Sequence, residues 1–375
     1  MTEEKQNQPD VTTWKESPIL MVKGFLMGSA DIVPGVSGGT LALITGIYDR
    51  LIFAISSFDA DAAGKLLKLR LKSVFEHVHW KFFLILLTGI FLAIFFFTRI
   101  VPLQVYMFTH PEIVYGLFFG LIVGSIVLLM TEVKQEERTV LNMLFLVAGA
   151  AIGFWVVNLV PEDTPQSFWF VMLSGSVAIC AMVLPGISGS YILLILGKYD
   201  YILSLLGSLG SSETVDAIYG LIPFILGAAV GLILFSRLLS WLLRHFHTAT
   251  LLVLIGFLIG SLYVIWPYQD REYDERVEST EMVPVDSEIV NQLQQREEVP
   301  AGPEYKRMAG IQNGDTPVDE RGVIIETVSR KLVSSKPYIP GYNWPEGENI
   351  NIWEGVAGIS SGMVILFGVG YLRKR

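Results

Sequence analysis

The sequence predicts an all-α polytopic membrane protein built from two related halves. Two observations point to the membrane: hydrophobic residues make up 52% of the 375 residues, and charged residues only 17%, against about 25% in soluble domains. A third observation, an internal repeat, points to the two halves. Four uncharged runs are long enough to cross roughly 30 Å of hydrocarbon as helices: Phe82–Thr98, Val140–Val160, Ala249–Trp266 and Gly355–Leu372. No basic stripe with interleaved aromatic residues is present, so nucleic acid is not expected as a partner.

The internal repeat is the most informative feature of the chain. Residues Ala30–Ile52 and Ala181–Leu203 align at a constant offset of 151 without a gap and share ten identities. Apolar identities are common in membrane segments, but these also include proline, glycine, serine, tyrosine and aspartate. We call the two segments motif one and motif two, and we expect one in each half.

The repeat continues more weakly after each motif. Thr98-Arg99 has a counterpart in Ser236-Arg237, and Gly120–Ser125 has one in Gly256–Ser261. Each half therefore consists of one motif followed by three hydrophobic spans.

Each motif is expected to break inside the membrane. Gln166–Gly197 is uncharged over 32 residues, which as one helix would be about 48 Å long. Pro185-Gly186 interrupts this run, since proline removes a backbone donor and glycine permits unusual dihedrals. Pro34 occupies the same place in motif one. The simplest prediction is a re-entrant hairpin that enters, breaks and returns on the same side, with Pro34 and Pro185 as hinges.

Loop charges predict the orientation. Basic residues gather in Lys65–Lys81, Arg237–Arg244 and Arg373–Arg375, which the positive-inside rule places in the cytoplasm. Stretches without Lys or Arg are then outside: Leu103–His110, Pro161–Ser167 and Ser204–Val215. One topology fits if both motifs are re-entrant. The halves are then inverted, and both termini are cytoplasmic. If each motif instead spans fully, the basic loop Lys65–Lys81 and the C-terminus fall on opposite sides.

This topology divides the chain into four parts. Between the last two spans lies an extracytoplasmic insertion with 17 acidic and 9 basic residues, a net charge of −8, which we expect to be flexible or weakly folded. The parts are a disordered tail (1–16), repeat one (17–160), repeat two (161–267 with 351–375) and the insertion (268–350).

Broken helices in inverted repeats are the plan of many secondary transporters, and the chemistry of these motifs suits an anion. A half-helix that starts after Pro-Gly-x-Ser-Gly directs unpaired N–H groups at a ligand, glycines allow close approach, and hydroxyls add donors. Alternatively, Pro-Gly only kinks a helix and the small residues only pack helices. The predicted phosphate-binding groups are Ser29, Gly35, Ser37, Gly38, Gly39 and Thr40 in motif one and Gly186, Ser188, Gly189, Ser190 and Tyr191 in motif two.

Three charged residues complete the predicted site. Arg99 and Arg237 end corresponding spans, and a guanidinium matches phosphate geometry with a planar fork; the alternative is ordinary snorkelling at a helix end. Asp31 lies in an apolar stretch, where an acid is a functional candidate. It either carries a coupling proton or cation, caps a half-helix, or pairs with Lys23.

The motifs resemble the signature of a known family. Gly28–Thr40 followed by Tyr48-Asp49, and Leu184–Ser190 followed by Gly197–Asp200, are similar to those of the polyprenyl-phosphate transporters. The resemblance implies an undecaprenyl phosphate translocase of the bacterial cytoplasmic membrane. Such a protein returns the carrier lipid from the outer to the inner leaflet for peptidoglycan and other envelope polymers, and it needs no cofactor. The insertion departs from the compact family pattern.

Two rival functions remain at this point. Membrane undecaprenyl-pyrophosphate phosphatases carry a PGxSRS motif, but Gly38 and Gly189 stand here in the place of that arginine. A secondary transporter of another anion is the second rival, because composition and spacing alone reach only an inverted-repeat transporter of an anion. The oligomeric state is not predicted.

Overall fold

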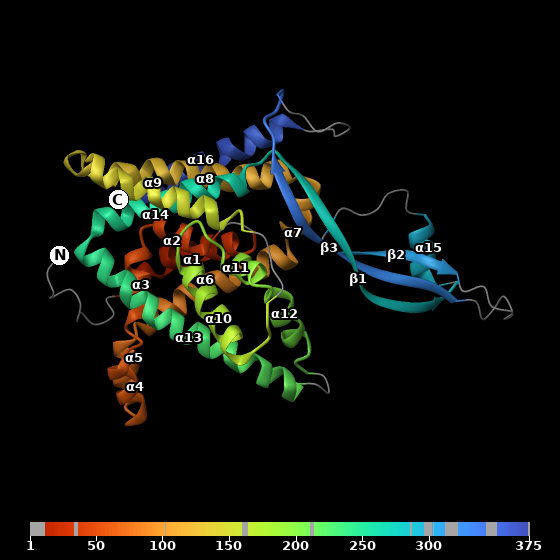
Figure 1. Ribbon diagram of the computed structural model, residues 1–375, viewed down its shortest axis with the longest axis horizontal. Coiled ribbons are helices and arrows are strands. Elements are labelled where there is room, and N and C mark those ends of the chain that lie inside the picture. Colours follow the sequence, from red (N-terminus) through yellow and green to blue (C-terminus); the bar gives the residue numbers. More distant parts are fainter. Residues whose placement is uncertain are drawn as a thin grey trace.

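Figure 1 shows a computed structural model of the chain. It describes residues 12–33, 37–101, 103–159, 164–210, 214–285, 287–295, 302, 304–311, 322–342 and 351–373.

Helices build both segments that contain a motif, and the first segment has the additional short helices α4, α5 and α7. The first half contains α1 (Ser17–Asp31), α2 (Gly38–Ile44), α3 (Tyr48–Ser56), α4 (Ala60–Leu67), α5 (Leu71–His77), α6 (Trp80–Arg99), α7 (Leu103–Thr109), α8 (Pro111–Glu132) and α9 (Val140–Val156), with short 3-10 turns at Trp14–Glu16 and Gln135–Glu137. The second half contains α10 (Phe168–Val183), α11 (Gly189–Ile195), α12 (Tyr199–Gly207), α13 (Thr214–His245), α14 (His247–Ile265) and α16 (Ile352–Arg373).

Four of these helices are long and apolar enough to cross a membrane, namely α6, α8, α13 and α14. The count rises to six if each bent pair, α2 with α3 and α11 with α12, forms one span. The helices α9, α10 and α16 are also apolar but have shorter apolar lengths. The polytopic helical membrane protein expected from the sequence is therefore confirmed.

Both motifs fold as hairpins. In motif one, the Gly38 amide donates to the Asp31 carboxylate at 2.6 Å, and the Lys23 ammonium donates to the Thr45 carbonyl at 2.8 Å. The start of α2 therefore lies at the end of α1, and α2 runs back along it. In motif two, Lys198, just after α11, donates to the carbonyl of Thr164, which precedes α10, at 2.9 Å. The chain thus also turns back there.

Glycines hold one long helix against each hairpin. A Cβ atom on Gly24 of α1 would collide with the Leu86 carbonyl of α6, and one on Gly175 of α10 would collide with the Phe224 carbonyl of α13. Small residues allow such close backbone approach between membrane helices. The Gly28 backbone lies next to Ile90, so α1 and α6 run in parallel.

The corresponding helices α8 and α14 run in opposite directions. At one end, Thr248 at the start of α14 donates to Glu137, just past the end of α8, at 2.9 Å. At the other end, the ring centroids of Phe119 in α8 and Trp266 after α14 are 5.2 Å apart. Helix α16 packs along α8, and α9 packs along α14, so the four form the layer along the top of Figure 1.

The insertion is an ordered β-structure, so the expectation of a flexible or weakly folded segment was wrong for its described part. Three antiparallel strands, in the order β1-β3-β2, extend away from the helices (Figure 1). Val290 of the short helix α15 packs on Val323 and Ile325 as a small separate core. The elements are β1 (Gln269–Pro284), α15 (Glu288–Gln294), β2 (Glu304–Ile311) and β3 (Gly322–Pro337).

Aromatic side chains fix the root of the insertion to the helices. The Tyr268 hydroxyl donates to the Ile352 carbonyl at 2.8 Å, and the Trp266 indole donates to the Tyr338 carbonyl at 2.9 Å. Arg271 lies 4.2 Å from the ring of Tyr115 in α8. These contacts tie β1 and β3 to the ends of α8, α14 and α16.

Candidate functional site

The tips of the two hairpins meet. We define tip one as residues 37–40 and tip two as residues 182–190. Thr40 accepts a hydrogen bond from the Gly186 amide at 2.9 Å, and the Ser37 hydroxyl lies 3.3 Å from the Met182 carbonyl. The Tyr48 hydroxyl donates to the Val183 carbonyl at 3.2 Å. Side chains of one motif therefore satisfy backbone groups at the break of the other, as buried polar groups require.

Tip one is closed and fully packed. Ser37 caps α2 by accepting from the Gly39 amide at 3.2 Å, and Ser37 and Thr40 are only 2% and 0% exposed. A Cβ atom on Gly39 would lie 2.7 Å from the Val183 carbonyl, so only glycine fits this contact. The half-helix begins at Gly38, as the motif predicted. Pro34 and Gly35 lie outside the described residues.

Asp31 caps this half-helix. Its carboxylate accepts from the Gly38 amide at 2.6 Å, which is one of the three roles that the sequence left open. Lys23 uses its ammonium group for the Thr45 carbonyl. The Ser29 hydroxyl donates to the Phe25 carbonyl of its own helix at 2.7 Å and lies beside the tip rather than in it.

Tip two is more open. Pro185 and Gly186 are buried, and Gly186 has a φ of +83°, with the Phe257 carbonyl 2.8 Å from where its Cβ would be. Glycine is thus required both for the dihedral and for the close approach. The half-helix begins at Gly189, as predicted. The hydroxyls of Ser188 and Ser190 are 2.8 Å apart, and Ser190 is exposed.

Tyr191 has a different role from Thr40, its counterpart in the repeat. Its hydroxyl donates to the Val157 carbonyl, just past α9, at 2.8 Å. It therefore anchors α11 to a neighbouring helix, while Thr40 joins the two tips.

Arg99 is the last residue of α6, as expected, but Arg237 lies inside α13, which continues to His245. The expectation that Arg237 ends a span was therefore wrong. Gly28 lies beside Ile90. A Cβ atom on Gly231 would lie 3.1 Å from the Ile179 side chain, so these two residues are also neighbours. Counting along the helices places Arg99 nearly two turns beyond the level of the end of α1, and Arg237 within about one turn of the level of the end of α10. Both side chains are exposed. Within the described residues, neither guanidinium forms an ion pair.

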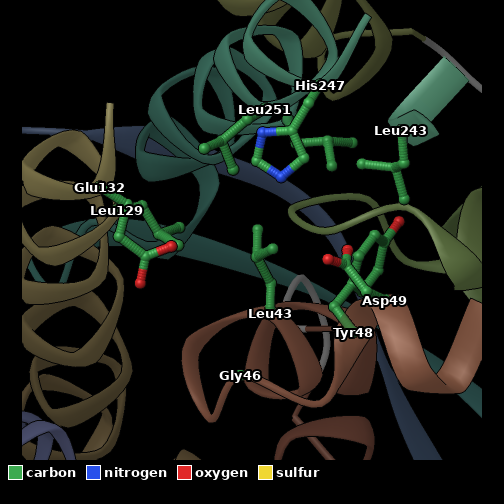
Figure 2. A pocket seen from close by; sticks show the side chains of 10 residues that line it. Leu43, Gly46, Tyr48, Asp49, Leu129, Glu132, Leu243, His247 and Leu251 are labelled. Carbon is green, nitrogen blue, oxygen red and sulfur yellow. The ribbon is translucent and has the colours of Figure 1, made fainter. Parts of the chain in front are cut away.

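A separate pocket lies beside residues 43–49 of motif one, away from tip one (Figure 2). It lies between the α2–α3 corner, the end of α8 and the junction of α13 and α14. Asp49, Glu132 and His247 contribute two carboxylates and an imidazole to its lining. Two carboxylates disfavour a phosphate there, so we do not assign the headgroup to this pocket. Nothing in the sequence pattern links Glu132 with His247, because Glu132 ends α8 and His247 begins α14, more than a hundred residues later.

Asp49 and Asp200 lie in the first turns of α3 and α12, where a negative charge suits the helix dipole. Asp200 also lies 3.8 Å from Arg276 of β1. In the part of the chain that the structure describes, no group of three His, Cys, Asp or Glu side chains is placed to hold a metal ion.

Comparison with known proteins then decides the family. Residues 27–283 match the profile of the VCA0040-like family, described as undecaprenyl phosphate translocase-like. The chain belongs to this family. A protein of Vibrio cholerae serotype O1 named polyprenyl-phosphate transporter is 38% identical over 264 residues, which cover 70% of this chain and 82% of the relative.

A second relative with the same name comes from another bacterium. The polyprenyl-phosphate transporter of Staphylococcus aureus is 30% identical over 265 residues, covering 66% of this chain and 86% of the relative. No solved structure matches the chain. The match includes both motifs, so the resemblance predicted from the two Pro-Gly segments is confirmed.

Proposed function

We propose that this protein moves undecaprenyl phosphate from the outer to the inner leaflet of the bacterial cytoplasmic membrane, so that the carrier lipid is used again in envelope synthesis. Family membership and the names of both relatives support transport of a polyprenyl phosphate and a role other than catalysis. The observation that carries the proposal is the meeting of the two tips through Ser37, Thr40 and Gly186.

Two-sided access follows if the two halves are inverted repeats, which we infer here. Helices α8 and α14 hold equivalent places in the two halves and run in opposite directions. A site at the junction of inverted repeats can open alternately to each side when one half rocks against the other. With both hairpins re-entrant, the basic loop at α4–α5 and both termini are cytoplasmic, and the insertion is outside.

The headgroup path follows from this arrangement. The phosphate enters from the outer leaflet and docks near Arg99 and the hydroxyls of tip two, of which Ser190 is already exposed. The tips part, and the phosphate passes to tip one and Arg237. The polyprenyl tail stays in lipid throughout, because only the charged group pays the desolvation cost that the protein must offset. Asp31 is the candidate for a coupling proton or cation, beside its capping role.

The phosphatase alternative is disfavoured by the same geometry. An enzyme that cleaves a phosphoanhydride needs an activated nucleophile and fixed positive charge on the transferred group. The Ser37 hydroxyl instead contacts the Met182 and Leu184 carbonyls at 3.3 and 3.4 Å. The position after each motif serine is a glycine, Gly38 or Gly189, where the phosphatase motif has arginine.

The test uses purified protein in vesicles that carry undecaprenyl phosphate in one leaflet. We expect the lipid to appear in the other leaflet, and no phosphate to be released from undecaprenyl pyrophosphate. Phosphate release without leaflet exchange would establish the enzyme instead. Exchange of an unrelated anion in place of the lipid would establish the other alternative, a general anion transporter.

A further inference from the structure

The α4–α5 hairpin stands apart from the bundle. It connects motif one to the span α6, and it projects across the direction of the long helices α8 and α14 rather than along it (Figure 1). Helix α4 packs on α5, and α5 packs on the start of α6, where the rings of Phe75 and Trp80 are 6.2 Å apart. A segment that projects across the spans, at the end where α6 begins, is placed to lie along a membrane surface.

Its apex alternates leucine with basic residues. The six residues Leu67–Lys72 read Leu-Lys-Leu-Arg-Leu-Lys, and all six are exposed. Leu67 and Leu69 are 85% and 82% exposed. Exposed leucines on α6 or α13 face hydrocarbon, but leucines interleaved with cations suit neither hydrocarbon nor water. The interface between headgroups and acyl chains accommodates both kinds of side chain.

The backbone at the apex adopts an energetically unfavourable conformation, and exposure to water does not compensate for it. Leu69 has a φ of 53°, in the left-handed region that a leucine rarely adopts. A turn in water would favour glycine or asparagine at such a position. Insertion of the leucine side chain among acyl chains offsets this cost.

A polar cluster behind the apex holds the two helices together. His77 bridges Asp59 at 3.1 Å and Lys65 at 3.4 Å, and Lys65 also pairs with Asp61 at 2.7 Å. This cluster engages Lys65. Within the described residues, Lys68, Arg70 and Lys72 form no ion pair, so three cations remain at the apex beside three exposed leucines.

We propose that the α4–α5 hairpin is an interfacial site for anionic phospholipids, in which Leu67, Leu69 and Leu71 enter the acyl region and Lys68, Arg70 and Lys72 bind headgroup phosphates. Juxtamembrane basic residues are attracted to anionic leaflets in this way. The assignment to the inner leaflet rests on the topology of the proposed function, whereas the lipid binding itself does not.

The test measures the depth of the apex directly. In a chain with Cys180→Ala, Leu69→Cys is labelled with an apolar fluorophore, and the purified protein is placed in phosphatidylcholine vesicles with or without phosphatidylglycerol. Nitroxide lipids that quench at shallow or deep positions then report the depth of the label. Matched labels at Phe91→Cys, on the exposed face of α6, and Ser279→Cys, in β1, give the deep and the aqueous limits.

We expect the label at position 69 to be quenched most by the shallow nitroxide, and at least about twofold more strongly with phosphatidylglycerol, since each base near an anionic surface strengthens binding several-fold. The triple variant K68Q/R70Q/K72Q should lose this dependence on phosphatidylglycerol. Quenching as weak as at position 279, or equal quenching in both kinds of vesicle, would overturn the proposal. The readout needs neither transport nor a uniform orientation, so it stands or falls separately from the translocase function.

Discussion

The two hairpin tips share a motif and the bounds of their half-helices, yet they differ in what covers them. Ser37 and Thr40 are sealed in tip one by backbone groups of tip two, whereas Ser190 is exposed and Ser188 is half-buried. A repeated sequence thus gives a repeated backbone without giving equal access. Under the proposed function, a phosphate would reach tip two without rearrangement but would reach tip one only after the tips part.

The largest effect on leaflet exchange is expected when the residues that distinguish the two tips are exchanged. Gly39 and Ser190 are equivalent at the offset of 151. Gly39→Ser should abolish leaflet exchange, because its Cβ would lie 2.7 Å from the Val183 carbonyl, and overpacking of this kind costs about 1–3 kcal/mol. The matched change Ser190→Gly should leave the fold intact. Exchange rates in vesicles and thermal unfolding in detergent measure both; full activity of Gly39→Ser would show that the tips are not closely packed.

The next largest effect is expected at the two arginines. Arg99→Ala or Arg237→Ala should reduce leaflet exchange by about tenfold or more, since a charge-assisted hydrogen bond contributes roughly 1.5–3 kcal/mol. Both side chains are exposed, so the unfolding temperature should not change.

Lysine variants and a remote control sharpen this second test. Arg→Lys at either position keeps the charge but loses the planar fork, so activity should be only partly restored. Lys134→Ala, in the exposed loop after α8, is the control that should transport normally. Normal exchange in both alanine variants would mean that neither arginine binds the headgroup.

The hydrogen bond between the tips gives a prediction of moderate size. Thr40→Val leaves the buried Gly186 amide without its acceptor, which should lower the free energy of unfolding by about 1–3 kcal/mol. Thr40→Ser should restore most of it. Tyr191→Phe, the matched change in motif two, should cost less because Tyr191 is only half-buried. Equal losses at the two positions would remove the distinction between a joining and an anchoring residue.

The smallest change in stability is expected for Asp31→Asn. The amide oxygen can still accept from the Gly38 amide, so the cap at 2.6 Å is retained in its neutral form. If Asp31 carries a coupling proton or cation, however, the variant should lose the dependence of exchange on a pH or cation gradient. Exchange that responds to gradients as in the unchanged protein would leave Asp31 with the capping role alone.

The hairpins were predictable because their information is local. Pro185-Gly186 breaks the chain where it stands, and a repeated Pro-Gly-x-Ser-Gly repeats the break. The contact between the tips was not predictable in this way. Thr40 and Gly186 are 146 residues apart, and neither motif contains a pattern that indicates which residue it contacts.

The ordered insertion was missed for a physical reason. Strand β1 carries charged residues on both faces, so it lacks the alternation of apolar and polar residues that marks a strand. Its order comes instead from pairing with β3 and from side-chain contacts such as Glu275 with Arg330 at 3.2 Å. Such pairing lies in the tertiary structure and is not visible in a single strand.

The most direct test of the central idea, that both tips form one headgroup site, is photo-crosslinking. An undecaprenyl phosphate analogue with a photoreactive group beside the phosphate is added to the protein in vesicles, and labelled peptides are mapped with and without excess unmodified lipid. We predict competed labels in the peptides that contain Ser37–Thr40 and Gly186–Ser190. Labels confined to the pocket around His247, or competed labels at only one tip, would contradict the account.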